Sequence, residues 1–466
     1  MLFNSYGFVL VFLPLVLLGW WGLKGRGLRL TFLTLASYLF YAWWDFRFVP
    51  LMVLSTSADY LAGWAIASTR SAPRRTTMLV LLLVFNLGIL GLFKYYDFFV
   101  GSLQGLGRLL GYNPEWPLLQ VALPVGISFY TFNSISYTID VYRGKLAPAR
   151  SWLEFSAFVA MFPHLVAGPI VRYADMAEQF GRLPRCTDAA KWVVGLWMLG
   201  LGMAKKVLVA DVVARGLVDP LWGQASQLDA AEAWLAALGY TVQIYFDFSG
   251  YSDMAVGLAL LLGFHFPQNF DSPYQATSIA DFWRRWHMSL SFWLRDYLYI
   301  PLGGSRGTRF LVGRNLLLTM SLGGLWHGAA WTFVAWGLYH GALLAGHSWL
   351  RGRGLVPRSR PLAVAVTFLS VVIGWVFFRA RSVGEALAML ATMIGLRHPE
   401  GGFLHLIASP WAVVATGSAL ALCFWARNTW ELRFPRTRLA AALLAALLIA
   451  CVLRFAAPTP FIYFQF

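Results

Sequence analysis

The chain has 466 residues, of which 59% are hydrophobic, 17% aromatic and only 12% charged. This composition excludes an ordinary water-soluble protein and indicates a polytopic membrane protein. The formal net charge of +16 lies mostly in short loops between apolar runs, as expected of cytoplasmic loops, and therefore does not require a nucleic-acid partner.

Apolar runs of roughly 17 to 25 residues, the length that spans a bilayer as a helix, recur without sustained period-two alternation. The sequence therefore predicts an all-α fold in a single integral-membrane domain over 1–466, with about eleven transmembrane helices and one or two re-entrant or interfacial pieces. The first run has no basic n-region and no cleavage site, which predicts an uncleaved helix followed by cytoplasmic Lys24, Arg26 and Arg29. The other runs are 30–43, 48–69, 77–100, 118–141, 191–217, 232–263, 361–379, 384–396, 409–426 and 438–456.

The run 152–171 is less regular, because it contains Pro163, His164, Gly168 and Pro169. Irregular backbone at membrane depth is tolerated only when it is buried in protein or lines a wet cavity. We therefore expect a broken or re-entrant segment here, and the glycine-containing stretches 249–250 and 323–328 predict irregular backbone of the same kind. His164 fits a structural, hydrogen-bonded role or a place in such a cavity, and the structural role is the more economical.

Charged residues also stand inside two apolar runs. Lys205, Lys206 and Asp211 lie in 191–217, and Asp247, Ser249 and Asp253 lie in 232–263. A carboxylate at this depth needs a partner. Asp247 and Asp253 therefore either cap broken helix ends or pair with a neighbouring Lys or Arg, or they line a catalytic funnel together with Ser249.

The stretch 281–347 carries the strongest chemical signal, and we place the catalytic centre within 240–347. His287 and His327 lie in aromatic, membrane-suited sequence. On a continuous helix, His287 would neighbour Trp283 and Ser291, four residues away on either side. Five arginines in this stretch could hold the phosphates of a donor, although a basic interfacial loop is also the ordinary positive-inside signal. They are Arg284, Arg285, Arg295, Arg306 and Arg309.

His327 follows Gly323 and Gly324 near the start of an apolar helix. Burial keeps an imidazole neutral and able to accept a hydroxyl proton, which suits acyl transfer. The alternative is a core histidine bonded to a carbonyl, and we prefer that structural role for His340 and His347. Cys186, Cys423 and Cys451 stand singly, so the sequence predicts no disulfide framework and no metal site.

Across nearly the whole chain, the sequence resembles the membrane-bound O-acyltransferases, and among them the bacterial alginate O-acetyltransferase branch. The resemblance implies that His327, in the WHG position beside Trp326, is the catalytic histidine. It also implies that His287, in the RRWH position, is the second polar residue of the site, which is often Asn or Asp in eukaryotic members. The matching stretches are 123–144, 162–173, 245–257, 269–304 and 323–341.

The resemblance further implies a multi-pass enzyme of the bacterial inner membrane with no permanently bound cofactor. It would take an acetyl group from a cytoplasmic donor, for which acetyl-CoA is the expected molecule. It would pass this group to a periplasmic acetyltransferase partner protein or to an exopolysaccharide such as alginate or cellulose. Trp326, Asp247, Ser249 and Asp253 would line the funnel. Direct transfer and an acetyl-histidine intermediate both fit. The alternatives are D-alanyl transfer to a teichoic acid-like polymer and, in a different class, a proton-coupled transporter or flippase.

Overall fold

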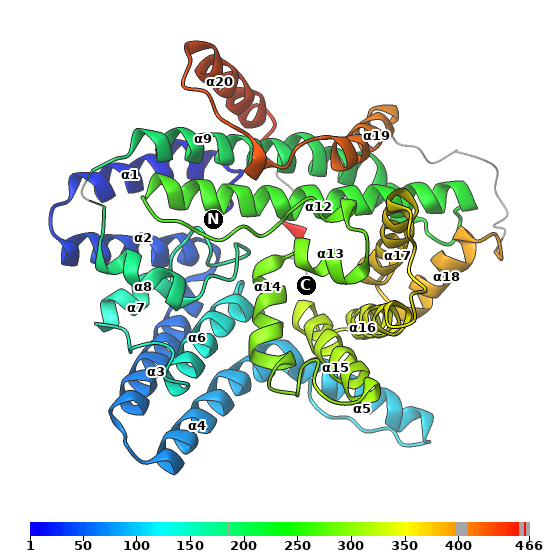
Figure 1. The fold of residues 1–466 in the computed structure, drawn as a ribbon, viewed down its shortest axis with the longest axis horizontal. Coiled ribbons are helices and arrows are strands. Elements are labelled where there is room, and N and C mark those ends of the chain that lie inside the picture. Colours follow the sequence, from blue (N-terminus) through cyan, green and yellow to red (C-terminus); the bar gives the residue numbers. More distant parts are fainter. Residues whose placement is uncertain (185, 398–408, 456–460, 463–466) are drawn as a thin grey trace. The chain divides into compact units, whose positions relative to one another are not determined.

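The computed structural model describes residues 1–184, 186–397, 409–455 and 461–462, and every regular element in these ranges is a helix (Figure 1). The predicted all-α class is therefore confirmed. The chain packs as two compact units, one of 1–195 with 258–266 and the other of 196–257 with 267–466. This division does not test the prediction of one domain, and each unit is described by itself.

The first unit is built around a polar helix, α6 (Ile127–Tyr142), whose residues are almost all buried and which packs on α3 and α4. Gly63 of α3 lies against the Tyr137 ring, where a side chain would collide with it. The remaining helices of this unit are α1 (Leu13–Gly22), α2 (Arg26–Asp45), α3 (Val49–Ser68), α4 (Ala72–Leu90), α5 (Tyr96–Leu109), α7 (Trp152–Val159) and α8 (Tyr173–Gly181).

The prediction of a continuous crossing over 118–141 is wrong in its first half. No regular element covers 113–126, and α6 begins only at Ile127. Gly126 has φ +75°, and a Cβ there would lie 2.7 Å from the carbonyl oxygen of Leu165. Pro124 and this tight approach end the extended entry and start the helix.

The predicted break in 152–171 is confirmed. Helix α7 ends at Val159, and 160–172 is an irregular but buried segment. His164 forms hydrogen bonds that fit a structural role. Its Nε2 lies 3.0 Å from the carbonyl oxygen of Phe158, and its Nδ1 lies 3.4 Å from Nδ2 of Asn133. The Nε2 atom therefore donates and Nδ1 accepts, which leaves this ring no nitrogen for chemistry.

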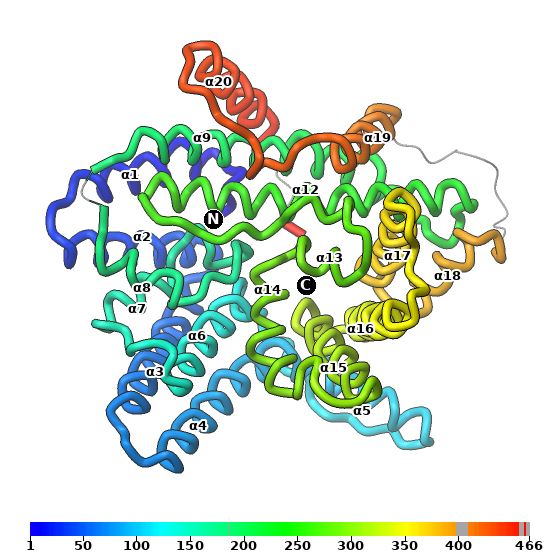
Figure 2. Tube along the Cα trace, in the orientation of Figure 1, coloured from blue at the N-terminus to red at the C-terminus, as the bar shows by residue number. Residues whose placement is uncertain are grey.

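The second unit contains the predicted catalytic centre. Two of its helices, α12 (Ala230–Leu261) and α9 (Ala189–Ala204), include residues that are assigned to the first unit as well as to the second. Both helices can be followed in the tube view (Figure 2). The remaining helices, apart from two short ones at 211–213 and 219–223, are α13 (Ile279–Arg285), α14 (Met288–Leu294), α15 (Arg309–His327), α16 (Trp331–Arg351), α17 (Arg360–Arg379), α18 (Val383–Met393), α19 (Pro410–Trp425) and α20 (Arg438–Val452).

Two of the backbone breaks expected in this unit are absent. Helix α12 runs through Ser249 and Gly250, and α15 runs through Gly323 and Gly324 to His327. These glycines serve close packing: a Cβ on Gly250 would lie 2.7 Å from the carbonyl oxygen of Gly202, and one on Gly324 would collide with the backbone of Phe333. Small residues that let helices approach are common in membrane proteins, and they need no break.

Four helical stretches in the described part of the chain are long and apolar enough to cross a bilayer. They support a multi-pass membrane protein, while the count of about eleven crossings stays a prediction. The four stretches are Arg26–Ser68, Ala72–Leu109, Ala189–Gly223 and Arg360–Arg379.

Candidate active site

His287 lies at a sharp corner between two short helices. Helix α13 ends at Arg285, and α14 begins at Met288, with His287 as its N-cap in the left-handed conformation (φ 42°, ψ 53°). The expectation of a continuous helix from Trp283 to Ser291 is therefore wrong. A non-glycine residue in this region is uncommon and carries backbone strain, which is more often held at functional sites than elsewhere.

Asn269 fixes the His287 imidazole. Its Oδ1 accepts from the backbone N–H of Ser289 at 3.2 Å and from the Ser289 hydroxyl at 2.9 Å, while its Nδ2 donates to Ser252 at 3.0 Å. These contacts settle which end of the amide is oxygen. His287 Nδ1 lies 3.2 Å from the same Oδ1, so Nδ1 must carry the proton. The neutral ring consequently presents a lone pair at Nε2.

His327 is the last residue of α15, and its ring faces that of His287 with 6.4 Å between the centroids. The rings of Trp336 and Phe378 make T-shaped contacts with His327, with centroids 5.2 Å and 5.3 Å away. The indole of Trp326 lies 5.0 Å from His327 and 6.1 Å from His287. The structure thus brings together the two histidines and the tryptophan singled out in the sequence.

The two imidazoles are buried among aromatic side chains. His287 is fully buried and His327 is only 4% exposed. Phe248 of α12 stands at right angles to the His287 ring at 4.7 Å. Burial lowers the pKa of His287 to about 3, so this imidazole is neutral at physiological pH. His287 therefore offers an uncharged base next to the His327 ring.

Asp247 and Asp253 each form an ion pair with a lysine. The Lys206 ammonium lies 2.5 Å from Asp247 and 2.9 Å from Asp211, and Lys205 lies 2.6 Å from Asp253. Both lysines belong to a π-helical turn, Lys205–Ala210, that continues α9. The pairing interpretation of the two carboxylates is confirmed. Ser249 is buried, and its Oγ has no hydrogen-bond partner among the described residues.

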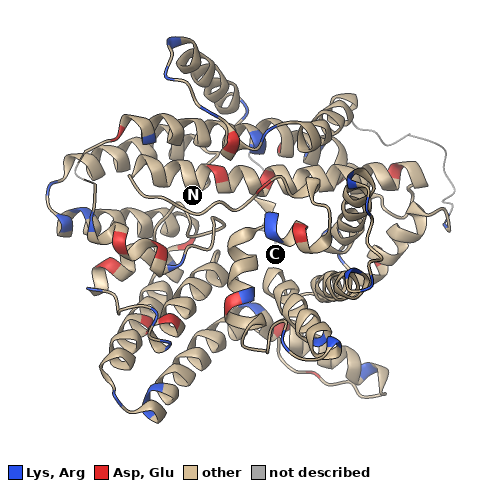
Figure 3. Cartoon of the chain, in the orientation of Figure 1, with Lys and Arg blue, Asp and Glu red and all other residues tan. Residues whose placement is uncertain are grey.

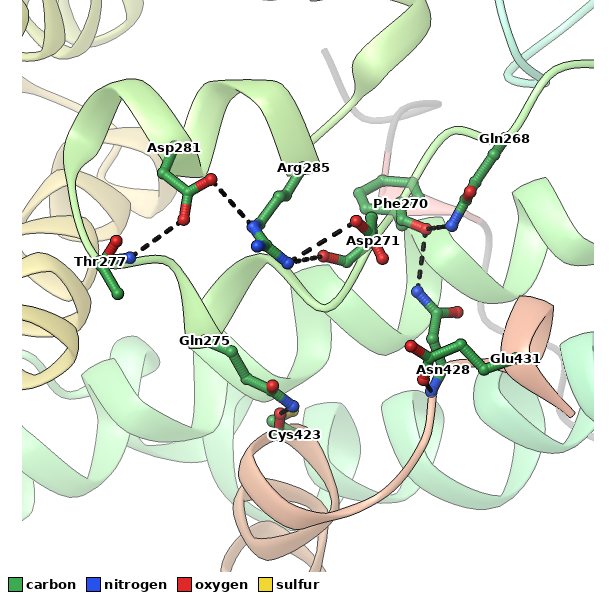
Figure 4. A network of polar contacts seen from close by, with 10 residues as sticks. All are labelled: Gln268, Phe270, Asp271, Gln275, Thr277, Asp281, Arg285, Cys423, Asn428 and Glu431. Atoms are coloured by element: carbon green, nitrogen blue, oxygen red, sulfur yellow. Dashed lines mark hydrogen bonds and ion pairs between the residues drawn. The ribbon is translucent and has the colours of Figure 1, made fainter. Parts of the chain in front are cut away.

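Two of the five arginines have structural partners. Arg285 bonds Asp281 at 3.1 Å and the Asp271 carbonyl, inside a network that continues through Phe270 to Asn428 (Figure 4). Arg295 pairs with neighbouring Asp296 at 2.7 Å. Arg285 therefore fixes the loop before α13, and the Phe270 carbonyl of that loop accepts from Asn428 after α19.

Two other arginines gather near a basic cavity of about 680 Å³ beside the N-terminus of α13. Arg284 lies close to His347, which lines this cavity, and the Arg309 guanidinium lies near Gly352 at the end of α16. The loop 351–360 supplies further cations. Those that line the cavity are Arg351, Arg358 and Arg360. The fifth arginine of the prediction, Arg306, is exposed in the loop before α15.

Helix α16 joins this cavity to the histidines. Trp336, against His327, and His347, in the cavity wall, are eleven residues apart on α16, about 16 Å along its axis. Between them lies His340, fully buried among aromatic rings, 4.9 Å from Trp336 and 5.3 Å from Trp283. Unlike His164, neither ring nitrogen of His340 has a hydrogen-bond partner among the described residues.

Comparison with known proteins identifies the chemistry. The model of the membrane-bound O-acyltransferase family matches residues 146–353. A probable alginate O-acetylase AlgI of Pseudomonas putida is 42% identical over the full length of both chains. The chain belongs to the membrane-bound O-acyltransferase family. The AlgI protein of Pseudomonas aeruginosa is 48% identical over 84% of this chain and 75% of its own length.

A second activity occurs among the relatives of this O-acyltransferase. A peptidoglycan O-acetyltransferase of Helicobacter pylori is 38% identical over 85% of the chain and 80% of its own length. The matched family region includes Asn269, His287 and His327, together with the basic cavity's α16 wall. The protein is therefore a membrane O-acetyltransferase, and its acceptor is the open question.

Proposed function

We propose that the protein passes an acetyl group from a cytoplasmic phosphorylated donor, acetyl-CoA, across the bacterial inner membrane for O-acetylation of an exopolysaccharide. The observation that carries the proposal is the buried pair of imidazoles, His287 and His327, 6.4 Å apart, which we take to be uncharged and call the neutral pair. Relatives named as alginate O-acetylases make a polysaccharide the natural acceptor class. The acetyl group reaches the polymer directly or through a periplasmic partner protein.

In the proposed reaction, His327 takes the proton of the acceptor hydroxyl as its oxygen attacks the acetyl carbonyl. The new ester C–O bond forms, the thioester C–S bond breaks, and the imidazolium returns its proton to the departing thiolate. General-base assistance of this kind contributes typically 10² to 10⁴ in rate. Neither a metal nor a redox group is needed to balance the step.

For His287 we propose a positioning role. With its proton on Nδ1 toward Asn269, the neutral ring has no N–H at Nε2 for an oxyanion. We therefore assign it to positioning the acceptor: a neighbouring hydroxyl of the polysaccharide can donate to Nε2 while His327 takes the proton of the attacking hydroxyl. The strained corner at His287 and the three bonds at Asn269 Oδ1 keep this ring in one orientation.

The donor would place its phosphates in the basic cavity beside α13 and extend its acyl arm along α16 toward His327. Guanidinium groups suit phosphate oxygens, and Arg351, Arg358 and Arg360 line that cavity. The cavity lies on the cytoplasmic side in this assignment, since basic loops stay in the cytoplasm.

The direct test follows the acetyl label. Inverted membrane vesicles that contain the protein and enclose the polymer are incubated with acetyl-labelled CoA outside, and both free CoA and the labelled product are measured. We expect stoichiometric CoA release and label on the polymer or on a periplasmic protein. Label that crosses the membrane while still attached to CoA, with no thiol released, would support transport and refute transfer. His265→Ala, an exposed histidine in the first unit, is the matched control.

A further inference from the structure

The first unit contains a second basic cavity. It has a volume of about 710 Å³ and lies between the turn that joins α1 to α2 and the end of α8. Four of its lining residues are cationic: Lys24, Arg26, Arg29 and Arg182. Figure 3 shows Lys and Arg gathered along the α1–α2 turn. All lining residues belong to the same compact unit, so the cavity is formed without the histidine site.

Arg29 is the central feature of this cavity. It is only 7% exposed, its guanidinium stacks 4.0 Å above the Trp20 ring, and Nη1 donates to the carbonyl oxygen of Pro184. The other two donor atoms, Nε and Nη2, are buried and have no hydrogen-bond partner among the described residues. A buried cation with unmade hydrogen bonds is costly, and an anion would offset both deficits at once.

The neighbouring charges leave the cavity positive. Arg26 pairs with the buried Glu154, and Arg182 pairs at 3.2 Å with Glu178, both ends of which are exposed. Lys24 and Arg29 have no carboxylate partner among the described residues. The Arg150 guanidinium lies against Gly181 in the cavity wall and adds a further cation at the rim.

We propose that this cavity is a binding site for a phosphate group, held by the free edge of the Arg29 guanidinium and by Lys24. A guanidinium fork fits two phosphate oxygens, and a stacked guanidinium is already oriented, so little side-chain freedom is lost on binding. The lysine supplies a point charge from the exposed turn. The same chemistry fits free inorganic phosphate and the headgroup of an anionic lipid at the cytoplasmic interface.

The first arm of the test uses inorganic phosphate. Its binding to the full-length protein in neutral detergent is measured by calorimetry against chloride at equal ionic strength. Lys24→Gln and Arg150→Gln change exposed residues, so they should fold normally, and we expect Lys24→Gln to weaken binding about tenfold. Arg29→Lys keeps the charge but removes the fork, and it should weaken binding as well. Arg74→Gln, an exposed arginine at the start of α4, is the control.

The second arm uses lipid. The protein is transferred through nanodiscs of mixed phosphatidylglycerol and phosphatidylcholine, and native mass spectrometry counts the phosphatidylglycerol that it retains. Retention lost in Lys24→Gln and Arg29→Lys identifies a lipid headgroup, whereas loss in the phosphate arm alone identifies a free phosphate. Binding unchanged by both variants in both arms would overturn the proposal. Neither readout depends on acetyl transfer, so the outcome is separate from that of the proposed function.

Discussion

The second unit handles polarity in its apolar interior in two opposite ways. Around Lys206, charge is retained and compensated: the ammonium, 1% exposed, lies between Asp247 and Asp211, and Asp247 also accepts from the backbone N–H of Ile462 at 2.9 Å. At the histidines, burial lowers the pKa of His287, and aromatic rings surround both imidazoles. Replacing one member of the compensated cluster leaves a buried charge unpaired, whereas an uncharged base in an apolar site can accept a proton when a substrate arrives.

The largest expected effect is on catalysis at the neutral pair. His327→Ala should lower acetyl transfer by about 10² to 10⁴, because it removes the proposed general base. The protein should still insert and unfold near its normal temperature, since His327 is at a helix end and a small side chain fits there. Labelled-acetate incorporation and thermal unfolding in detergent measure both. His287→Ala should keep residual activity, and equal, total loss in both variants would instead indicate one coupled unit.

The compensated cluster should give the reverse result. Lys206→Met leaves Asp247 and Asp211 buried without their cation, and breaking such a buried pair costs about 3 to 5 kcal/mol of folding free energy. We expect the unfolding temperature to fall sharply while the folded fraction retains its activity per molecule.

Neighbouring residues of the same cluster supply the matched control variants for that experiment. Lys205→Met should cost less, because the Lys205 side chain is 19% exposed. Adding Asp247→Asn and Asp211→Asn to Lys206→Met should recover part of the loss. A Lys206→Met protein of normal stability but without activity would place the cluster in the catalytic machinery and abolish the distinction between the two regions.

The sequence predicted the polar residues of both regions better than it predicted their backbone geometry. The polar residues at depth and the two histidines were visible because such residues are expensive in apolar segments. The corner at His287 was not, because Trp283 and Ser291 have good helical spacing and only the tertiary bond to Asn269 reveals the turn. The opposite error occurred at Gly250. The sequence predicted a helix break there, whereas the glycine allows close helix packing.

The roles of Asn269 and of the loop 351–360 could not be predicted from the sequence. Asn269 lies within a stretch that resembles the family, but nothing in its spacing indicates that its oxygen fixes the tautomer of a ring eighteen residues away. The loop's arginines look like ordinary positive-inside charge, and only the cavity gives them a common target. Contacts between segments far apart in the chain leave no periodicity to detect.

A moderate effect is expected at Asn269, which tests whether the neutral pair depends on one fixed tautomer. Asn269→Leu should lower transfer about tenfold, because the His287 Nδ1–H and Ser289 lose the oxygen that accepts their hydrogen bonds. Asn269→Asp keeps the acceptor and adds a negative charge, which raises the pKa of His287, so the acid limb of the activity profile should move to higher pH. An unchanged profile in an active Asn269→Asp protein would contradict the assigned tautomer.

The smallest effect is expected at the basic cavity, where exposed charges act in a high-dielectric environment. Arg351→Gln and Arg360→Gln should each raise the KM for the acetyl donor only a few-fold and leave kcat unchanged, because an exposed charge contributes about 0.2 to 1 kcal/mol to an ion pair. The effect should shrink as salt is added, since added ions screen surface charges. Arg353→Gln is the control: it lies in the same loop but stacks on Trp349 at 3.9 Å and does not line the cavity. A fall in kcat with unchanged KM would remove the donor from this cavity and leave the histidine pair without its proposed supply route.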